Sequence, residues 1–305
     1  MDDFFITAAS WERRCLGILS KVRSYHAKHV ILVAYDEDNP LREEHVREMQ
    51  TCLERIGKMH LLRATHSAPL KSVRETLDVI AQSGLSSPPR ISIDITSFTK
   101  IHLLQLLNAL DLSGFGRSMN IYYTEPVDFV TDDNQPRTRG ISNVRAIETF
   151  IGSHRPSKDD ILLLFLGYEG ARALALWQHL EPNKIFAVIP DPPYKESWHG
   201  RTEKQNLYLL SCLQPANILR CHSLDPAGAE NLLEEQVCNS GGPTGQYNFF
   251  IGPLGTKPQT VGLFRFWRKH RGSATFMYAS PLKERCDERS FPAGRTWLID
   301  SSSRW

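Results

Sequence analysis

Two short segments carry the residue types that bind phosphate. Each follows an apolar run that predicts a strand and precedes a run that predicts a helix. The first segment holds Thr96, Ser97, Thr99 and Lys100, and the second holds Gly255, Thr256 and Lys257. Hydroxyls, a lysine ammonium and the N–H groups at a helix N-terminus all donate hydrogen bonds to a phosphate. Glycines at 252 and 255 would also let the backbone approach such a ligand closely. The alternative is that the threonines only cap the two helices.

An aromatic residue beside a glutamate follows two other predicted strands. The residues are Ser10, Trp11 and Glu12 in one place and Gly167, Tyr168 and Glu169 in the other. An aromatic ring can stack on a nucleotide base, and a carboxylate can accept a hydrogen bond from its exocyclic amine. The same pattern is also typical of a helix start with a core aromatic and an acidic first turn.

Two histidines follow strands and offer acid–base chemistry. His66 and His222 each precede a serine, and with Glu12 and Glu169 they are the candidate acid–base groups for a hydrolytic reaction. A histidine in a surface loop is the alternative. The sequence lacks H-E-x-x-H, G-x-S-x-G, G-x-G-x-x-G and the Walker motif, and its six cysteines form no C-x-x-C pair. It therefore predicts no metal site and no nicotinamide or flavin cofactor.

The elements that would position these residues alternate strand and helix. Strands are expected at 4–9, 30–35, 60–64, 91–95 and 120–123, with helices at 11–23, 41–56, 73–80 and 100–112. After a turn-rich segment, strands are expected at 161–166, 185–189, 217–221, 248–251 and 275–278, with helices at 170–180, 203–212, 227–237 and 258–268. This alternation predicts an α/β fold with two Rossmann-like domains and mostly parallel sheets, spanning 1–155 and 156–305. Residues 285–305 resist interpretation, apart from a possible edge strand at 296–299.

The two halves share more than this rhythm. Lys100 and Lys257 lie 157 residues apart, as do Arg63 and Arg220, while Tyr123 and Tyr278 lie 155 apart. All the matches keep their order, and most fall at the ends of predicted strands. The sequence therefore predicts an internal duplication.

Composition limits the class of protein. The 305 residues are 41% hydrophobic and 23% charged, which is typical of a globular protein with a substantial core. The net charge of +2 gives no support for direct nucleic-acid binding through bulk charge. No apolar run approaches the roughly 20 residues that a membrane helix needs. With dispersed cysteines and no basic leader, the chain is expected to be cytoplasmic, with no membrane partner.

The segment Asp94-Ile95-Thr96-Ser97-Phe98-Thr99-Lys100 resembles the hallmark of the CRISPR-associated Rossmann-fold (CARF) superfamily, D/N-x-T-G-G-T-K. It keeps the acid, both threonines and the lysine, and it has Ser97-Phe98 in place of the glycine pair. Leu254-Gly255-Thr256-Lys257 keeps one glycine, the threonine and the lysine. Tandem copies in one chain are similar to the SAVED-type sensors of cyclic-oligonucleotide defence systems. The resemblance implies a cyclic-oligonucleotide ligand and a partner effector protein.

Three functions stay open from the sequence. The first is a nucleotide or cyclic-oligonucleotide sensor in bacterial antiviral defence, with the ligand held in a crevice between the two halves. The second is a phosphodiesterase or other hydrolase that acts on a nucleotide or nucleic acid. The third is a protein-interaction subunit of a defence complex, in which the repeated polar residues are structural.

Overall fold

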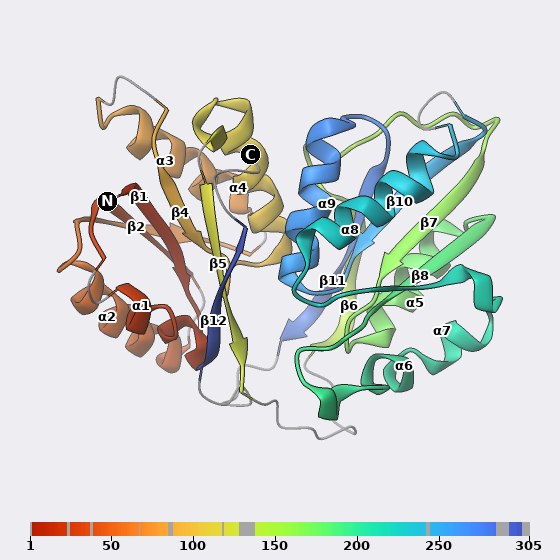
Figure 1. The fold of residues 1–305 in the computed structure, drawn as a ribbon, viewed down its shortest axis with the longest axis horizontal. Coiled ribbons are helices and arrows are strands. Elements are labelled where there is room, and N and C mark those ends of the chain that lie inside the picture. Colours follow the sequence, from red (N-terminus) through yellow and green to blue (C-terminus); the bar gives the residue numbers. More distant parts are fainter. Residues whose placement is uncertain are drawn as a thin grey trace. The chain divides into compact units, whose positions relative to one another are not determined.

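The structure is a computed structural model, and it describes residues 2–22, 25–36, 39–66, 68–84, 88–117, 119–127, 138–241, 245–284 and 293–300. The chain forms two compact units, each with one six-stranded sheet flanked by helices (Figure 1). Both sheets are mostly parallel, so the predicted α/β fold class with two Rossmann-like halves is confirmed. Among the described residues, no helix combines the length and apolar character that a membrane span needs.

The first sheet has the order β12-β5-β4-β1-β2-β3. Its strands are β1 (Asp2–Ala9), β2 (Ala27–Tyr35), β3 (Lys58–Ala64), β4 (Ile91–Asp94), β5 (Met119–Pro126) and β12 (Ala293–Asp300). The first five run parallel, and β12 lies antiparallel on the edge of β5. Apart from residues near the amino ends of β1 and β2, the central strands β4, β1 and β2 are buried, as the continuous apolar run in β2 predicts for a sheet covered on both faces.

Helices connect these strands and cover the sheet (Figure 1). They are α1 (Leu19–Val22), α2 (Pro40–Leu53), α3 (Pro69–Ala81) and α4 (Lys100–Leu112), with short 3₁₀ turns at Arg13–Leu16 and Phe115–Arg117. The pair α1 and α2 pack together, as do α3 and α4. Val46, Met49 and Leu53 lie one helical turn apart on α2 and are buried against β1 and β2.

The second sheet has the order β6-β11-β10-β7-β8-β9. Its strands are β6 (Thr138–Ala146), β7 (Asp159–Phe165), β8 (Lys184–Pro190), β9 (Ile218–Cys221), β10 (Tyr247–Pro253) and β11 (Thr275–Glu284). Its helices are α5 (Gly170–Leu180), α6 (Arg201–Gln205), α7 (Leu207–Ser211), α8 (Pro226–Leu233) and α9 (Lys257–Lys269), with 3₁₀ turns at Glu196–Trp198 and Pro215–Asn217. A π-helical turn, Glu234–Cys238, extends α8.

The two sheets share topology and register. Ala8 of β1 pairs with Val33 of β2, and Phe165 of β7 pairs with Val188 of β8. Likewise Ala34 pairs with Arg63, and Ile189 pairs with Arg220. Each residue of the first sheet named here therefore has its equivalent in the second sheet 157 or 155 residues later, and these are the offsets that relate the two halves in sequence. The duplication stays a prediction, and this common register agrees with it.

The structural units differ from the expected division at residue 155. One unit holds Met1–Thr131 with Cys286–Trp305, and the other holds Asp132–Arg285. The difference comes from two edge strands, because β6 follows β5 in sequence yet pairs antiparallel with β11, whereas β12 pairs with β5. Local periodicity indicates that a strand exists, but it does not indicate which open sheet edge the strand will join.

Most expected elements are present, and the differences have local causes. The expected helix at 11–23 is broken into a 3₁₀ turn and one short α-helical turn around Gly17. A Cβ atom at Gly17 would meet Thr124 Cγ2 at 2.5 Å, so the chain passes too close to β5 for a larger residue. The turn-rich segment that follows β5 contains β6, which the sequence did not predict because its residues are mostly polar. The edge strand expected at 296–299 is present as β12.

Candidate functional site

The carboxyl ends of β1 and β4 form the topological switch point of the first sheet. From β1 the chain crosses toward β2 and β3, and from β4 it crosses toward β5. In doubly wound sheets, ligands bind outside the carboxyl ends of the strands at this point. The predicted segments Ser10–Glu12 and Thr96–Lys100 directly follow these two strands. In the second sheet, Gly167–Glu169 follows β7 and Gly255–Lys257 follows β10.

Thr99 caps α4 and fixes the start of this helix. Its Oγ1 accepts a hydrogen bond from His102 N at 3.2 Å, and its own N–H donates to the Tyr35 hydroxyl at 3.0 Å. Lys100 is the first helical residue and is half-buried. Ser97 is half-buried too, and its hydroxyl has no hydrogen-bond partner among the described residues. Ser97 and Lys100 are therefore the members of this segment best placed to donate to a ligand.

Thr96 is turned into the protein. Its hydroxyl donates to Asp94 Oδ1 and accepts from Thr124 N at 2.9 Å. Asp94, which is fully buried, also accepts from Thr96 N at 3.1 Å and from the Thr7 hydroxyl at 3.0 Å. The neighbouring Phe98 is fully buried as well. The acid and first threonine of the motif thus hold the β4 turn against β1 and β5.

Glu12 is paired with a buried arginine. Its Oε2 accepts from Arg14 Nε at 2.8 Å and from Arg14 Nη2 at 2.5 Å. Arg14 Nη1 also donates to the Tyr123 hydroxyl at 3.3 Å and to Thr124 O at 3.4 Å, at the end of β5. Trp11 is only 7% exposed, so little of its ring is available for stacking on a base. These contacts tie the β1 loop to β5.

The second unit repeats this arrangement with Glu169 and Arg172. Arg172 Nη1 donates to Glu169 Oε2 at 3.1 Å, and Nε donates to Ala279 O at 2.9 Å, at the equivalent place on β11. The guanidinium lies 4.5 Å from the ring centroid of Tyr278. Tyr168 is half-buried, with Arg201 4.7 Å above its ring. Both predicted glutamates are thus engaged by arginine, which favours a positioning role for them.

Thr256 caps α9 through a reciprocal capping box. Gln259 N donates to Thr256 Oγ1 at 3.2 Å, and Thr256 N donates to Gln259 Oε1 at 3.0 Å. The Thr256 hydroxyl also donates to Ser223 O at 2.6 Å, so its proton is already used. Lys257 is half-buried at the first helical position.

The glycines around this turn serve packing. A Cβ atom at Gly255 would meet Gln259 Oε1 at 2.3 Å, and one at Gly252 would meet Leu164 Cδ2 at 2.6 Å. At Gly167 it would meet Leu254 O at 2.5 Å, so the loops after β7 and β10 lie in contact. Close packing is therefore a second reason for glycine at 252 and 255, and their role in letting a ligand approach the backbone stays a prediction.

A histidine that the sequence analysis did not single out lies beneath the first site. His102 is fully buried, with Nδ1 3.0 Å from the Tyr35 hydroxyl and Nε2 3.3 Å from Ser72 Oγ. Burial lowers the pKa of His102 to about 3, with a smaller contribution from the nearby His66. His66 is half-buried, with its ring 4.4 Å from that of Tyr35. Ser67, its predicted companion, lies outside the described residues.

The other histidine candidate lies in an exposed turn. His222 Nδ1 accepts a hydrogen bond from Leu224 N at 2.9 Å, which fixes the turn before α8. Glu12 and His66 follow strands separated by β2 in the sheet order, and the same holds for Glu169 and His222 in the second sheet.

Sequence reasoning also missed Arg14 and Arg172. Tyr123 and Tyr278 do match between the halves, and these tyrosines were the available signal. The arginines lie 158 residues apart, so they fall out of line with the repeat offsets. The one-residue shift goes with a local difference in structure, because Arg14 lies on a 3₁₀ turn whereas Arg172 lies on the α-helix α5.

No known protein-family profile and no curated protein matches the chain. Among solved structures it is similar to Can2 from Sulfobacillus thermosulfidooxidans in complex with cyclic tetra-adenylate, at 15% identity and a TM-score of 0.29, over 41% of this chain and 32% of Can2. It is also similar to the cytoplasmic domain of a prokaryotic cation chloride cotransporter, at 10% identity and a TM-score of 0.28, over 94% and 99% of the two chains. A putative universal stress protein from Pseudomonas aeruginosa follows at 9% and 0.27, over 92% and 94%. At these TM-scores the likenesses assign neither a family nor an activity to the chain.

Proposed function

We propose that the chain binds a nucleotide-type ligand at the carboxyl ends of its parallel strands. The observation that carries the proposal is the repeated arrangement at the two switch points. In each unit, a capped helix that begins with a lysine follows a central strand (β4 in the first, β10 in the second), beside a loop that holds an aromatic residue and a glutamate. Helix N-termini and lysines both stabilise phosphate charge.

The two sites differ in the donors that they offer. In the first, Ser97 and Lys100 supply a hydroxyl and an ammonium, and Ile101 supplies a second helical N–H. In the second, Pro258 occupies that helical position and has no N–H to donate. We therefore assign the tighter phosphate contacts to the first unit.

The resemblance of Asp94–Lys100 to the CARF hallmark extends the proposal to the ligand class. We infer a cyclic oligonucleotide as the ligand, a role in bacterial antiviral defence, and a partner effector protein that receives the signal. Hydrolysis of a phosphodiester is less well supported, because the predicted acid–base groups are engaged elsewhere or separated by a strand.

Calorimetric titration of the full chain with cyclic tri- and tetra-adenylate, ATP and AMP tests the proposal. A charge-assisted hydrogen bond to a phosphate contributes about 1.5–3 kcal/mol, so Lys100→Ala should weaken binding by about 10- to 150-fold. Lys257→Ala should weaken it by less. Lys28 and Lys184 lie at the opposite, amino ends of β2 and β8, and Lys28→Ala and Lys184→Ala are the matched controls.

Two results would overturn the proposal. One is that no ligand of the panel binds, and the other is that Lys100→Ala and Lys257→Ala bind as tightly as the two controls. Analysis of the recovered ligand, with and without added Mg²⁺, separates binding from hydrolysis. Recovery of intact ligand is the expected result.

A further inference from the structure

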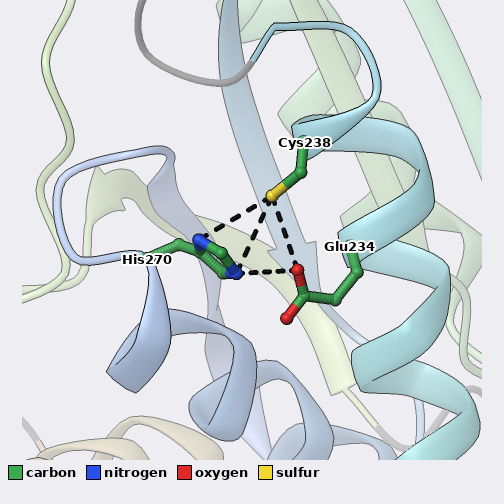
Figure 2. Close-up of side chains that lie close together, drawn as sticks. All are labelled: Glu234, Cys238 and His270. Atoms are coloured by element: carbon green, nitrogen blue, oxygen red, sulfur yellow. Dashed lines mark hydrogen bonds and ion pairs between the residues drawn. The ribbon is translucent and has the colours of Figure 1, made fainter.

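A cysteine, a histidine and a glutamate meet at the far end of α9 (Figure 2). Glu234 and Cys238 lie on the π-helical turn that extends α8, and His270 directly follows α9. Residues four apart on a helix lie on the same face, so the Glu234 and Cys238 side chains point the same way (Figure 2). The potential ligand atoms of the three residues all lie within 4.8 Å of one another.

The distances are close to those of a tetrahedral zinc site. With usual zinc bond lengths, ligand atoms lie about 3.4–3.6 Å apart. Cys238 Sγ is 3.5 Å from Glu234 Oε2 and 3.8 Å from both ring nitrogens of His270. His270 Nε2 and Glu234 Oε2 are 2.7 Å apart, so they need to separate by less than an ångström. A rotation of the two side chains supplies this.

The geometry disfavours a catalytic cysteine triad. In such a triad, one histidine nitrogen faces the sulfur and the other faces the acid. Here the sulfur is equally far from both nitrogens, and it donates to the glutamate itself. Burial and the Glu234 carboxylate both raise the pKa of the Cys238 thiol, which opposes nucleophilic reactivity. A cation would reverse this effect, because it favours the thiolate.

The charged side chains around the cluster leave Glu234 Oε2 directed at Cys238 and His270. Lys269 Nζ is 2.6 Å from Glu230 Oε1 and 3.7 Å from Glu234 Oε1, and Arg265 pairs with Glu230 at 2.7 Å. Glu230 therefore compensates most of the nearby positive charge, while Glu234 Oε2 faces the cysteine and the histidine. The Glu234 and His270 side chains are 31% and 34% exposed, so a metal ion and a water molecule can reach the cluster.

We propose that Glu234, Cys238 and His270 bind Zn²⁺, with water as an exchangeable fourth ligand. A thiolate, an imidazole and a carboxylate are a zinc ligand set, and three protein ligands with one open position are typical of reactive zinc sites. On binding, the ion replaces the thiol proton, which passes to solvent. The ion would link the turn after α8 to the end of α9.

The zinc site is separate from the proposed nucleotide site. Thr256 and Lys257 lie at the start of α9 and His270 lies beyond its end, so a helix of 13 residues, about 20 Å, separates them. The sequence pattern could not reveal the site, because His270 is 32 residues from Cys238. The four-residue spacing of Glu234 and Cys238 was the only local signal.

Titration of the metal-free full chain with Zn²⁺ and with Co²⁺ tests the proposal. We expect one tight equivalent of each ion, and a thiolate-to-cobalt charge-transfer band in the near ultraviolet. Because loss of an outer-shell group already costs 10- to 100-fold in metal affinity, Cys238→Ser and His270→Gln should each weaken binding by more than about 100-fold. Cys52→Ser, at another half-buried cysteine, should bind as the parent does.

Circular dichroism of each variant reports whether it folds, and Glu234→Gln provides a variant that keeps both the sulfur and the imidazole. In the parent, Zn²⁺ should raise the melting temperature, whereas in the three ligand variants it should not. Absence of a cobalt–thiolate band, or equal zinc affinity in Cys238→Ser and Cys52→Ser, would overturn the site. Neither result depends on whether the chain binds nucleotides.

Discussion

Replacement of His102 by glutamine should make the first unit more resistant to acid. His102 is fully buried between Tyr35, Ser72 and Phe98, and burial lowers its pKa to about 3 from an ordinary 6.5. Between these two values, the unfolded chain binds a proton on this ring and the folded chain does not. The free energy of unfolding therefore rises with pH across this window and falls as the pH is lowered through it.

The size of the effect follows from these two values. At pH 5 the unfolded state gains about 2 kcal/mol from protonation of this histidine, and at pH 7 it gains only about 0.2 kcal/mol. His102→Gln removes this term. Glutamine is also what the second unit carries at the equivalent position, where Gln259 completes the cap of α9. The variant should therefore fold and should lose about 2 kcal/mol less than the parent between pH 7 and pH 5.

Native-state hydrogen exchange of α4 and β4 amides, read at both pH values, measures the free energy of opening of this unit. His29 and His60 also have pKa values lowered by burial, but their effect is the same in parent and variant and cancels in the comparison. His26→Gln, at an exposed position of the same unit, is the control and should behave as the parent does. If parent and His102→Gln lose equal stability between the two pH values, the buried neutral histidine is refuted.

Three further predictions concern the architecture. Arg172→Met leaves the Glu169 carboxylate without its guanidinium, and urea unfolding should show a loss of about 3–5 kcal/mol, partly recovered when Glu169→Gln is added. Gly262→Ala places a Cβ atom 2.1 Å from Pro226 O, so α8 and α9 must separate, at a cost of about 1–3 kcal/mol in the same assay. Deletion of 286–305 removes β12, and exchange of β5 amides should accelerate whereas that of β11 amides should not.

The parallel strands were predictable because their signal is local. Val30–Ala34 is a continuous apolar run and is completely buried, as strands covered on both faces require. The helix at 100–112 was found to the residue, because Thr99 caps it and Gly114 follows its end. The edge strands were not predictable in the same way. β6 is largely polar, and the partner of each edge strand depends on which sheet edge is open.

The position of the candidate site was predictable from the sequence, whereas the role of each of its side chains was less predictable. Threonines and lysines at strand ends are visible in any sequence, and the switch point gathers them by topology. Whether a hydroxyl faces a ligand or the protein depends on neighbours far away in sequence. Thr96 is held by Thr124, and Thr256 is held by Ser223. The sequence offers no pattern that pairs these positions.

The two helix starts also show how a repeated scaffold can acquire different chemistry. Thr99 N and Thr256 N both need an acceptor at the same place in the fold. In the second unit, Gln259 supplies it from within the helix, whereas in the first the Tyr35 hydroxyl supplies it from β2 and brings His102 with it. In the first unit, the Tyr35 hydroxyl therefore contacts two polar groups, the Thr99 N–H and the His102 ring. The two switch points therefore present unequal surroundings to a ligand, because the neutral His102 contacts this hydroxyl in the first unit and Gln259 takes the equivalent position in the second.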